Sequence, residues 1–160
     1  MQRIPLEVAL AKLLTALDLK LAAAESCTGG LIGHRITNVP GSSAYYVGSI
    51  TAYAYEAKVR LLGVSWDTLN RYGAVSRETA LEMARGVRAA LGADIGVSVT
   101  GIAGPEGGTP EKPVGTVWIG LSVSGDDTDD AWMFVWQGDR LANKEQSAEA
   151  ALQIVIDHFA

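Results

Sequence analysis

Stretches with helical and with strand-like spacing of apolar residues alternate along the chain. Residues 4 to 18 carry apolar side chains at roughly helical spacing, which predicts an amphipathic opening helix that covers one face of a sheet. Residues 19 to 24 form a short apolar run, followed by a polar cluster and by Gly29-Gly30, where a second helical pattern begins. This order predicts a strand, a turn and a helix.

The next segment repeats the change from strand to helix. Residues 44 to 54 are rich in Tyr, Val, Ile and Thr, which is typical of a buried or half-buried strand. Residues 56 to 62 then predict a short helix that Gly63 ends.

Two further helices are predicted before the next strand. The first is small, with Ser65 or Asp67 as its N-cap and an end near Gly73. The second begins after Ser76 and presents a face of Ala, Leu and Met as far as Leu91. Both are expected to serve as scaffold.

The last third of the chain predicts three strands and a helix. A β-branched run at residues 95 to 100 leads into a loop of glycine and proline at residues 101 to 115, and such a loop seldom serves packing alone. Residues 116 to 124 and 131 to 136 predict antiparallel strands joined by the acidic turn GDDTDD, and Asp139 caps the last helix. The order of elements predicts an α/β fold: a three-layer α/β/α sandwich with a mixed, partly antiparallel sheet.

Composition narrows the classes of function. The 13 Lys and Arg against 18 Asp and Glu give a net charge of −5, which repels a phosphate backbone, so nucleic acid is not an expected partner. No apolar stretch approaches the ~20 residues that span a bilayer, and no signal peptide is visible. A cytoplasmic protein without a membrane partner is expected.

Metal and disulfide chemistry are not expected either. Cys27 is the only cysteine, so no intrachain disulfide can form. His34 and His158 are too few and too isolated for a Cys/His zinc site, and neither is given a role. Cys27 is interpreted as structural, because a cysteine nucleophile normally needs a histidine beside it. No metal and no cofactor are predicted.

Six motifs follow one another in order between Leu19 and the C-terminus, and together they resemble the CinA C-terminal domain family. Because they are long and of low degeneracy, the match is more specific than a lone glycine fingerprint. They are AESCTGG (residues 24–30), PGSSAYYVGSITAY (40–53), EAKVRLLGV (56–64), GAVS (73–76), VTGIAGPEGGTPEKPVGTVWIGL (99–121) and GDR (138–140).

The resemblance implies an activity and a domain plan. Members of the family are expected to hydrolyse the carboxamide of nicotinamide mononucleotide to the acid and ammonia through a Ser/Lys dyad, recycling pyridine nucleotides. Residues 1–160 are expected to form a single CinA C-terminal domain-like unit. The N-terminal domain of larger members, which resembles molybdopterin-binding proteins, is not expected in this chain.

Ser26 is the predicted catalytic nucleophile. It follows a predicted strand and precedes a helix, so its hydroxyl can lie at the mouth of the sheet while the amides of residues 27 to 30 face an oxyanion. Gly29 and Gly30 would let a substrate approach the backbone closely. Serine is also a preferred N-cap, and without the resemblance a capping role would be favoured.

Lys58 matches the catalytic lysine of the family and is predicted to accept the Ser26 proton. This role requires its pKa to fall from ~10.4 toward ~7–8, through burial or through a neighbouring positive charge such as Arg60. For an arbitrary lysine, a solvated position paired with Glu56 would be the better interpretation.

Several polar side chains are candidates for substrate binding. Thr28 and Thr100 offer hydroxyls beside glycine turns, with strand-end capping as the alternative. Arg140 in the GDR motif can grip a phosphate or carboxylate with its forked guanidinium, and Lys112 is a weaker candidate. Tyr53 can stack on a pyridine ring or donate a hydrogen bond, or it can lie in the core.

The glycines of the 101–115 loop offer a second way to bind an anion. Gly101, Gly104, Gly107 and Gly108 could let backbone N–H groups converge on a phosphate. They do not form a nucleotide-binding fingerprint, and tight turns would explain them equally well.

One segment departs from the family pattern. Tyr53-Ala54-Tyr55 stands where the family usually has Tyr-Ser-Asn before Glu-Ala-Lys, so a hydroxyl and an amide are lost and a phenol is added beside Lys58. If the lost Asn normally fixes the lysine or the carboxamide, the chain is instead a catalytically weakened or inactive nucleotide-binding domain with a regulatory role. A purely structural domain would leave the dyad and the glycine loop as remnants.

The expected partners are a small-molecule nucleotide substrate and a second copy of the chain. Four tryptophans and the apolar stretch TVWIGLSV could supply an oligomer interface. A homodimer is predicted.

Overall fold

The computed structural model describes residues 2–125 and 129–160 of the chain. The helices are α1 (Leu6–Leu17), α2 (Leu31–Thr37), α3 (Tyr55–Leu62), α4 (Trp66–Tyr72), α5 (Arg77–Leu91) and α6 (Arg140–Phe159), with a short 3-10 helix, η1, at Ser42–Ala44. The strands are β1 (Leu21–Glu25), β2 (Tyr46–Thr51), β3 (Ile95–Gly101), β4 (Thr116–Val123) and β5 (Asp130–Val135).

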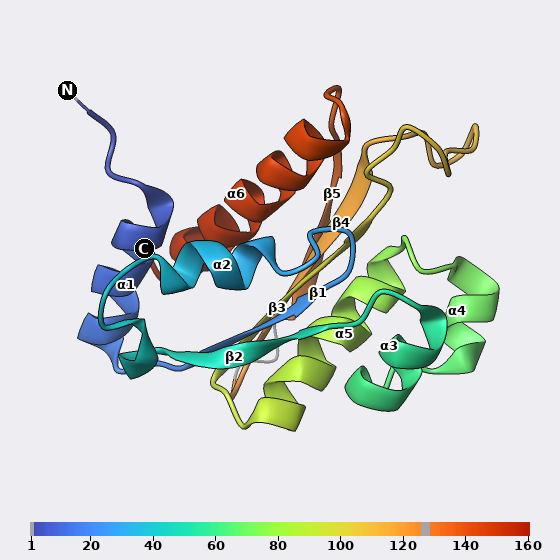
Figure 1. Cartoon of the computed structure of the whole chain (residues 1–160). Helices are drawn as coiled ribbons and strands as arrows, with labels where there is room; N and C mark the ends of the chain where they lie inside the picture. The colour runs from blue at the N-terminus through green and yellow to red at the C-terminus, as the bar shows by residue number, and fades with distance from the viewer. Residues whose placement is uncertain (1, 126–128) are drawn as a thin grey trace.

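The strands form one mixed sheet in the order β2-β1-β3-β4-β5. β1 runs parallel to β2 and to β3, whereas β4 and β5 continue the sheet as antiparallel neighbours. Figure 1 shows α1, α2 and α6 on one face of the sheet and α3, α4 and α5 on the other. The predicted three-layer α/β/α sandwich with a partly antiparallel sheet is therefore confirmed.

Polar side chains start three of the helices. Ser76 caps α5 and Asp139 caps α6, as predicted, because each accepts a hydrogen bond from an N–H group of the first turn. At α4 the cap is Ser65, whose Oγ accepts a hydrogen bond from the Thr68 N–H at 3.0 Å. Asp67, the alternative cap, lies within the first turn instead.

Two predicted elements were too long. The opening helix, predicted at residues 4–18, begins after Pro5 and ends before Asp18, whose φ of 53° is left-handed. The strand predicted at residues 44–54 is limited to β2, because η1 occupies the chain up to Ala44 and the sheet pairing ends at Thr51.

The antiparallel pairing of β4 with β5 is confirmed. The acidic turn GDDTDD, predicted to join the two strands, includes residues 126–128, which lie outside the described residues. β4 lies between β3 and β5 and most of its residues are buried. This strand has no free edge, and most of its apolar side chains pack in the core, although Trp118 is only half-buried. The expectation that the stretch TVWIGLSV supplies an oligomer interface stays a prediction.

Side-chain alternation along β1 decides where the residues after it point. Ala23 packs in the hydrophobic core on the face of α1, α2 and α6, whereas Ala22 and Ala24 pack in the core on the face of α3 and α5. The same alternation directs Glu25 toward α2 and Ser26 toward α3, as their hydrogen bonds show. The end of β1 thus connects both helical layers.

Candidate active site

Ser26 is the first residue after β1 and is held against the neighbouring strand. Its N–H donates to the Val99 carbonyl oxygen of β3 at 3.0 Å, and the residue is only 7% exposed. The Ser26 Oγ atom lies 2.9 Å from the Nζ atom of Lys58, which comes from α3. The two predicted catalytic residues are therefore in direct contact, although 32 positions separate them in the sequence.

Lys58 is the largest fully buried side chain of the structure, with an exposed fraction of 1%. Its Nζ atom donates to Ser26 Oγ, to the Ala52 carbonyl oxygen at 3.0 Å and to the Tyr53 carbonyl oxygen at 2.8 Å. The alternative of a solvated lysine paired with Glu56 is wrong, because no carboxylate of the described residues lies within ion-pair distance of Nζ.

Burial lowers the pKa of Lys58 from 10.5 to about 8, because an apolar environment disfavours the ammonium form. The predicted contribution of Arg60 is not found, since that residue is exposed and has no part in the pKa shift. A lysine with a pKa near 8 is partly neutral at physiological pH, and this is the state in which it can accept a proton.

Ser26 does not cap the helix that follows it. α2 begins at Leu31, its N-cap is Gly30, and no side chain of that cap accepts a hydrogen bond. Because the only described side-chain partner of Ser26 Oγ is Lys58, the capping interpretation fails and the hydroxyl faces the amine instead.

The first turn of α2 is bound by Glu25, a residue that the sequence analysis missed. Its carboxylate accepts hydrogen bonds from the N–H groups of Gly30 at 3.2 Å, Ile32 at 2.9 Å and Gly33 at 3.1 Å. The Thr28 hydroxyl donates to the same carboxylate at 2.7 Å. An acidic residue at the end of an apolar strand and just before a Gly-Gly helix start was the available signal.

These bonds limit which amides can stabilise an oxyanion. The Gly30 N–H is bound to Glu25, and the Gly29 N–H donates to the Ser26 carbonyl oxygen at 3.1 Å. The expectation that the amides of residues 27 to 30 all face a substrate is therefore wrong for Gly29 and Gly30. The N–H groups of Cys27 and Thr28 have no carbonyl or carboxylate acceptor among the described residues, so they are the donors that the turn can offer.

Gly29 and Gly30 have the backbone conformation that favours glycine. Their φ angles are 60° and 106°, in the left-handed region. A Cβ atom on Gly29 would lie 3.7 Å from the Nζ atom of Lys144, which shows that this α6 cation lies over the turn. Lys144 was missed in the sequence, where helix periodicity alone gives it no special position.

Arg140 and Tyr53 come together beside this turn. Arg140 donates from Nη1 to the Gly104 carbonyl oxygen at 2.7 Å and from Nη2 to the Tyr53 hydroxyl at 3.4 Å. Tyr53 is 65% exposed, so the alternative that it lies in the core is wrong. Within the described residues, neither Arg140 nor Lys144 is paired with a carboxylate, and both cations are therefore available to an anionic ligand.

A pocket of about 480 Å³ includes Arg140 in its lining. It is lined by Ala103, Pro105, Val114, Gly138, Asp139, Arg140 and Leu141. A larger hollow of about 530 Å³ lies between the N-terminal segment and α6, and its lining includes neither Ser26 nor Lys58. Ser26 and Lys58 line neither of these two hollows, and their direct contact distinguishes the candidate site instead.

Thr28 and Thr100 are both buried and have their hydroxyl hydrogens engaged. Thr28 donates to Glu25, and Thr100 donates to the Ala74 carbonyl oxygen at 2.8 Å, which ties the end of β3 to the segment before α5. Thr100 contacts neither Ser26 nor Lys58 through a described hydrogen bond. Its side chain therefore acts as a strand-end anchor in this structure.

Close packing accounts for several loop glycines. A Cβ atom on Gly101 would lie 2.5 Å from Val117 Cγ2, and Gly104 and Gly108 meet Val114 in the same way. Gly101 was a predicted substrate contact, but the near approach of β3 to β4 is what requires a glycine at this position.

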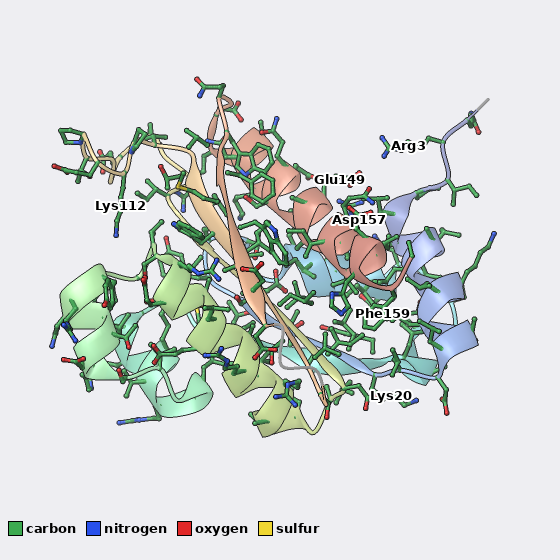
Figure 2. The ribbon with its side chains drawn as sticks, turned by 180° about the vertical axis from the view of Figure 1, so that it is seen from behind. Arg3, Lys20, Lys112, Glu149, Asp157 and Phe159 are labelled. Carbon is green, nitrogen blue, oxygen red and sulfur yellow. The ribbon has the colours of Figure 1, made fainter. Side chains whose placement is uncertain are left out.

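Other candidate side chains point elsewhere. Burial raises the pKa of the Cys27 thiol to about 11, so it remains protonated at neutral pH and is a poor nucleophile. Lys112 donates to the Tyr72 carbonyl oxygen, and Figure 2 shows its side chain reaching from the loop toward α4. His34 lies near Asn38 on the exposed side of α2.

The unusual segment Tyr53-Ala54-Tyr55 leaves the lysine in place. Two main-chain carbonyl oxygens, of Ala52 and Tyr53, hold Lys58, and neither depends on the side chains at positions 54 and 55. The Tyr55 ring packs against Trp66 of α4, with ring centroids 6.4 Å apart. The added phenol is therefore accommodated by α4.

Residues 2–125 and 129–160 contain neither a metal-ion cluster nor a membrane-spanning helix. No cluster of three or more His, Cys, Asp or Glu side chains suited to a metal ion occurs there. None of the helices in these ranges combines the length and the apolar character needed to cross a membrane.

Comparison with known sequences gives a consistent result. A model of the CinA C-terminal domain matches residues 3–159 of the chain. A CinA-like protein of Salinibacter ruber is 53% identical over 150 residues, which cover 94% of this chain and 36% of that protein. A CinA-like protein of Chloroherpeton thalassium is 52% identical over 154 residues, with the same two coverages. The chain thus spans little more than a third of the length of these relatives.

Comparison with solved structures gives a similarity over nearly the whole chain. A CinA superfamily protein from Klebsiella pneumoniae superposes with a TM-score of 0.92 at 32% identity, covering 96% of this chain and 95% of its own. The competence/damage-inducible protein CihA from Agrobacterium tumefaciens gives a TM-score of 0.87 at 36% identity, covering 98% and 97%.

Proposed function

The chain belongs to the CinA C-terminal domain family, and from this premise we propose that it is an amidohydrolase that converts nicotinamide mononucleotide to nicotinic acid mononucleotide and ammonia. Ser26 is the nucleophile and Lys58 the base. One observation carries the proposal: a lysine with a pKa of about 8 lies 2.9 Å from a buried serine hydroxyl. The names of the relatives state no substrate, so the proposed substrate rests on the resemblance of the motifs.

The surroundings of Lys58 direct its lone pair toward the serine. A neutral amine has two hydrogens and one lone pair, and the Ala52 and Tyr53 carbonyl oxygens are placed to accept the two hydrogens. The third direction is occupied by Ser26 Oγ. The neutral form of Lys58 therefore presents its lone pair to the serine proton, as general-base catalysis requires.

Ser26 and Lys58 take part in both the formation and the breakdown of the tetrahedral intermediate. Ser26 Oγ bonds to the carboxamide carbon as its proton passes to Lys58, and the N–H groups of Cys27 and Thr28 stabilise the oxyanion. The C–N bond then breaks, and Lys58 returns the proton to the departing ammonia. Water, deprotonated by Lys58, hydrolyses the Ser26 ester, and the acid product leaves with the serine restored.

The charged side chains around the turn match an anionic substrate. Arg140 and Lys144 are cations without a carboxylate partner in the described chain, and Arg140 contacts the exposed Tyr53. We assign the substrate phosphate to this pair of cations and the pyridine ring to the exposed Tyr53 side chain. The N-terminus of α2 is not available for the phosphate, because Glu25 already occupies its amides.

We also propose that the chain acts in the cytoplasm, where pyridine nucleotides are recycled, and that it forms a homodimer. The dimer surface is the free edge of β5, where Trp132, Met133 and Val135 are exposed. A strand edge with large apolar side chains favours pairing with another strand.

The deciding experiment measures ammonia and acid product from nicotinamide mononucleotide with the purified protein. Ser26→Ala and Lys58→Ala should each lower kcat by at least ~10³-fold, because each removes a partner that the other cannot replace. Ser42→Ala and Lys112→Ala serve as matched controls, since both lie outside the dyad and should turn over normally.

The outcomes separate the amidase from its alternative. Turnover that disappears in both dyad variants supports the amidase. Saturable binding of the nucleotide by the wild-type protein without turnover would instead identify a nucleotide-binding domain with a regulatory role, the alternative that the Tyr53-Ala54-Tyr55 segment raised. Equal turnover in the wild type and the Ser26→Ala variant would exclude Ser26 as the nucleophile.

A further inference from the structure

Glu25 is a fully buried carboxylate that the proposed chemistry does not use. Its exposed fraction is 0%, and no Lys, Arg or His side chain of the described residues lies within ion-pair distance. Four donors surround it instead: one hydroxyl and three main-chain N–H groups. A buried charge is costly unless it is hydrogen-bonded in this way, so such a residue needs an explanation.

The turn of residues 26–30, which contains the proposed nucleophile, is called the nucleophile turn. The main chain and the side chain of Glu25 bind its opposite ends. The main chain is fixed in the sheet, where Glu25 pairs with Thr51 of β2 and Val99 of β3. The carboxylate binds the start of α2, on the other side of Ser26. The residue therefore bridges the turn that contains the nucleophile.

The Glu25 carbonyl group extends this bridge to the base. It accepts a hydrogen bond from the Ala52 N–H at 2.8 Å, and the carbonyl oxygen of Ala52 is one of the two that hold Lys58. Contacts of Glu25 thus help to fix the positions of both Ser26 and Lys58.

We propose that Glu25 is a positioning residue of the reaction. Its carboxylate acts as an internal anion that occupies the amides of the first turn of α2, so that the turn closes with Ser26 against Lys58. The N–H groups of Cys27 and Thr28 are then the ones left for the oxyanion. This inference rests on the proposed amidase function, but its central claim, the placement of a reactive Ser26, can be measured separately.

The negative charge and the two acceptor oxygens are the properties that matter. A carboxylate only accepts hydrogen bonds, and here Oε1 accepts three and Oε2 accepts one. In Glu25→Gln the side chain keeps nearly the same volume, but an amide NH2 group replaces one carboxylate oxygen. This donor would face the N–H groups of α2, which are donors themselves. Glu25→Asp keeps the charge and shortens the reach to α2.

The experiment compares Glu25→Gln and Glu25→Asp with the wild type by two measurements. The first is kcat and KM for nicotinamide mononucleotide. The second is the rate at which a fluorophosphonate probe labels Ser26, which reports nucleophile placement without the substrate. Ser65→Ala is the matched control, because it removes a helix cap at α4 and leaves the nucleophile turn unchanged.

We expect kcat and the labelling rate of Glu25→Gln to fall together by about 10–100-fold, while KM changes by less than about threefold. Glu25→Asp should recover part of both rates, because it retains the charge. Ser65→Ala should lower the thermal midpoint and leave both rates unchanged, as a purely structural effect would.

Two results would overturn the inference: a Glu25→Gln protein whose labelling rate stays within about twofold of the wild type, or a wild type that the probe does not label at Ser26. If Glu25→Gln does not fold, Thr28→Val replaces it, since this change removes one of the four donors and keeps the Thr28 amide; labelling that remains within about twofold would again overturn the inference. A wild type that is labelled at Ser26 but releases no ammonia would refute the proposed substrate and leave the role of Glu25 measurable.

Discussion

The Nζ atom of Lys58 is surrounded by two main-chain carbonyl oxygens and one hydroxyl, at a position that water hardly reaches. The carbonyl oxygens favour the ammonium form, whereas burial opposes it. Since the pKa is lowered to about 8, burial has the larger effect. The residue is therefore protonated in most molecules at pH 7 but can lose its proton within the physiological range.

This balance predicts a pH profile. Only the neutral form of Lys58 can accept the serine proton, so kcat/KM should rise about tenfold per pH unit below pH 8 and level off above it. Initial rates between about pH 6.5 and 9.5 test this, and the substrate phosphate does not interfere because its second pKa lies near ~6. A profile that is flat from about pH 7 to 9 would contradict the assigned base.

Arg140 gives a second prediction at this scale. If its guanidinium binds the substrate phosphate, Arg140→Ala should raise KM for nicotinamide mononucleotide by about 10–100-fold, the effect of losing a charge-assisted hydrogen bond. Arg140→Lys should restore part of the affinity through its charge. Nicotinamide riboside, which lacks the phosphate, is the control: its KM should not change in the variant. An equal rise in KM for both substrates would place Arg140 near the reacting group instead.

The boundaries and caps of the elements show what the sequence can predict. Hydrophobic periodicity and capping residues correctly placed α5 and α6, because these signals act within a few neighbouring residues. The end of β2 was predicted poorly, because Ala52 is apolar and buried like a strand residue but belongs to the turn before α3. Where a strand stops depends on its partner, which the local pattern does not contain.

The candidate site was even harder to predict from the local sequence pattern than the ends of the strands. The dyad was identified from a resemblance between motifs, since a lone serine before a helix predicts a cap and a lone lysine predicts a solvated charge. Glu25 was missed because three of its four donors are main-chain amides, which every sequence contains. Lys144 was missed because only the packing of α6 brings it over Gly29.

The crossing of α3 and α5 yields a prediction at the scale of elements. A Cβ atom on Gly86 of α5 would lie 1.8 Å from the carbonyl oxygen of Leu62, at the end of the helix that carries Lys58. Alanine would improve helix propensity by ~1 kcal/mol, but an overlap this close to a backbone atom costs ~2–3 kcal/mol and forces the helices apart.

Gly86→Ala should therefore lower the free energy of unfolding by ~1–2 kcal/mol, as measured by urea denaturation. It should also reduce kcat about tenfold or more through displacement of Lys58. Ala89→Ser, at an exposed position of the same helix, is the control and should change neither. A Gly86→Ala protein with the stability and kcat of the wild type would show that α3 can move without disturbing the dyad.

At the scale of the whole molecule, β5 has one edge with which no other strand of the described residues pairs. Ala131 marks the direction of its backbone groups: its carbonyl oxygen accepts from Arg77 at 2.8 Å and its N–H donates to the Asp130 carboxylate. Both groups thus point away from β4. Because backbone direction alternates in an antiparallel pair, the N–H and C=O groups of Met133 and Val135 also point away from β4.

These groups define a register for a second copy. In an antiparallel pair, Met133 of one copy lies opposite Val135 of the partner subunit, and Val135 lies opposite Met133 of the partner subunit. The backbone N–H and C=O groups of these four residues are then hydrogen-bonded, and a twofold axis lies at Phe134. Ala131 takes no part, because Arg77 and Asp130 already satisfy it. β5 contains neither lysine nor proline, the residues that commonly protect a free edge.

A charged side chain on the outer edge of β5 should therefore prevent dimer formation. Met133 is 55% exposed, so Met133→Lys costs little in the monomer but places two ammonium groups in the paired ladder. Sedimentation equilibrium should give a dimer for the wild type and a monomer for the variant. Leu61→Lys, at a position on α3 that is 50% exposed, is the control and should remain dimeric. A Met133→Lys dimer would move the interface away from β5, and a monomeric wild type would refute the dimer itself, because the exposed edge would then persist without a partner strand.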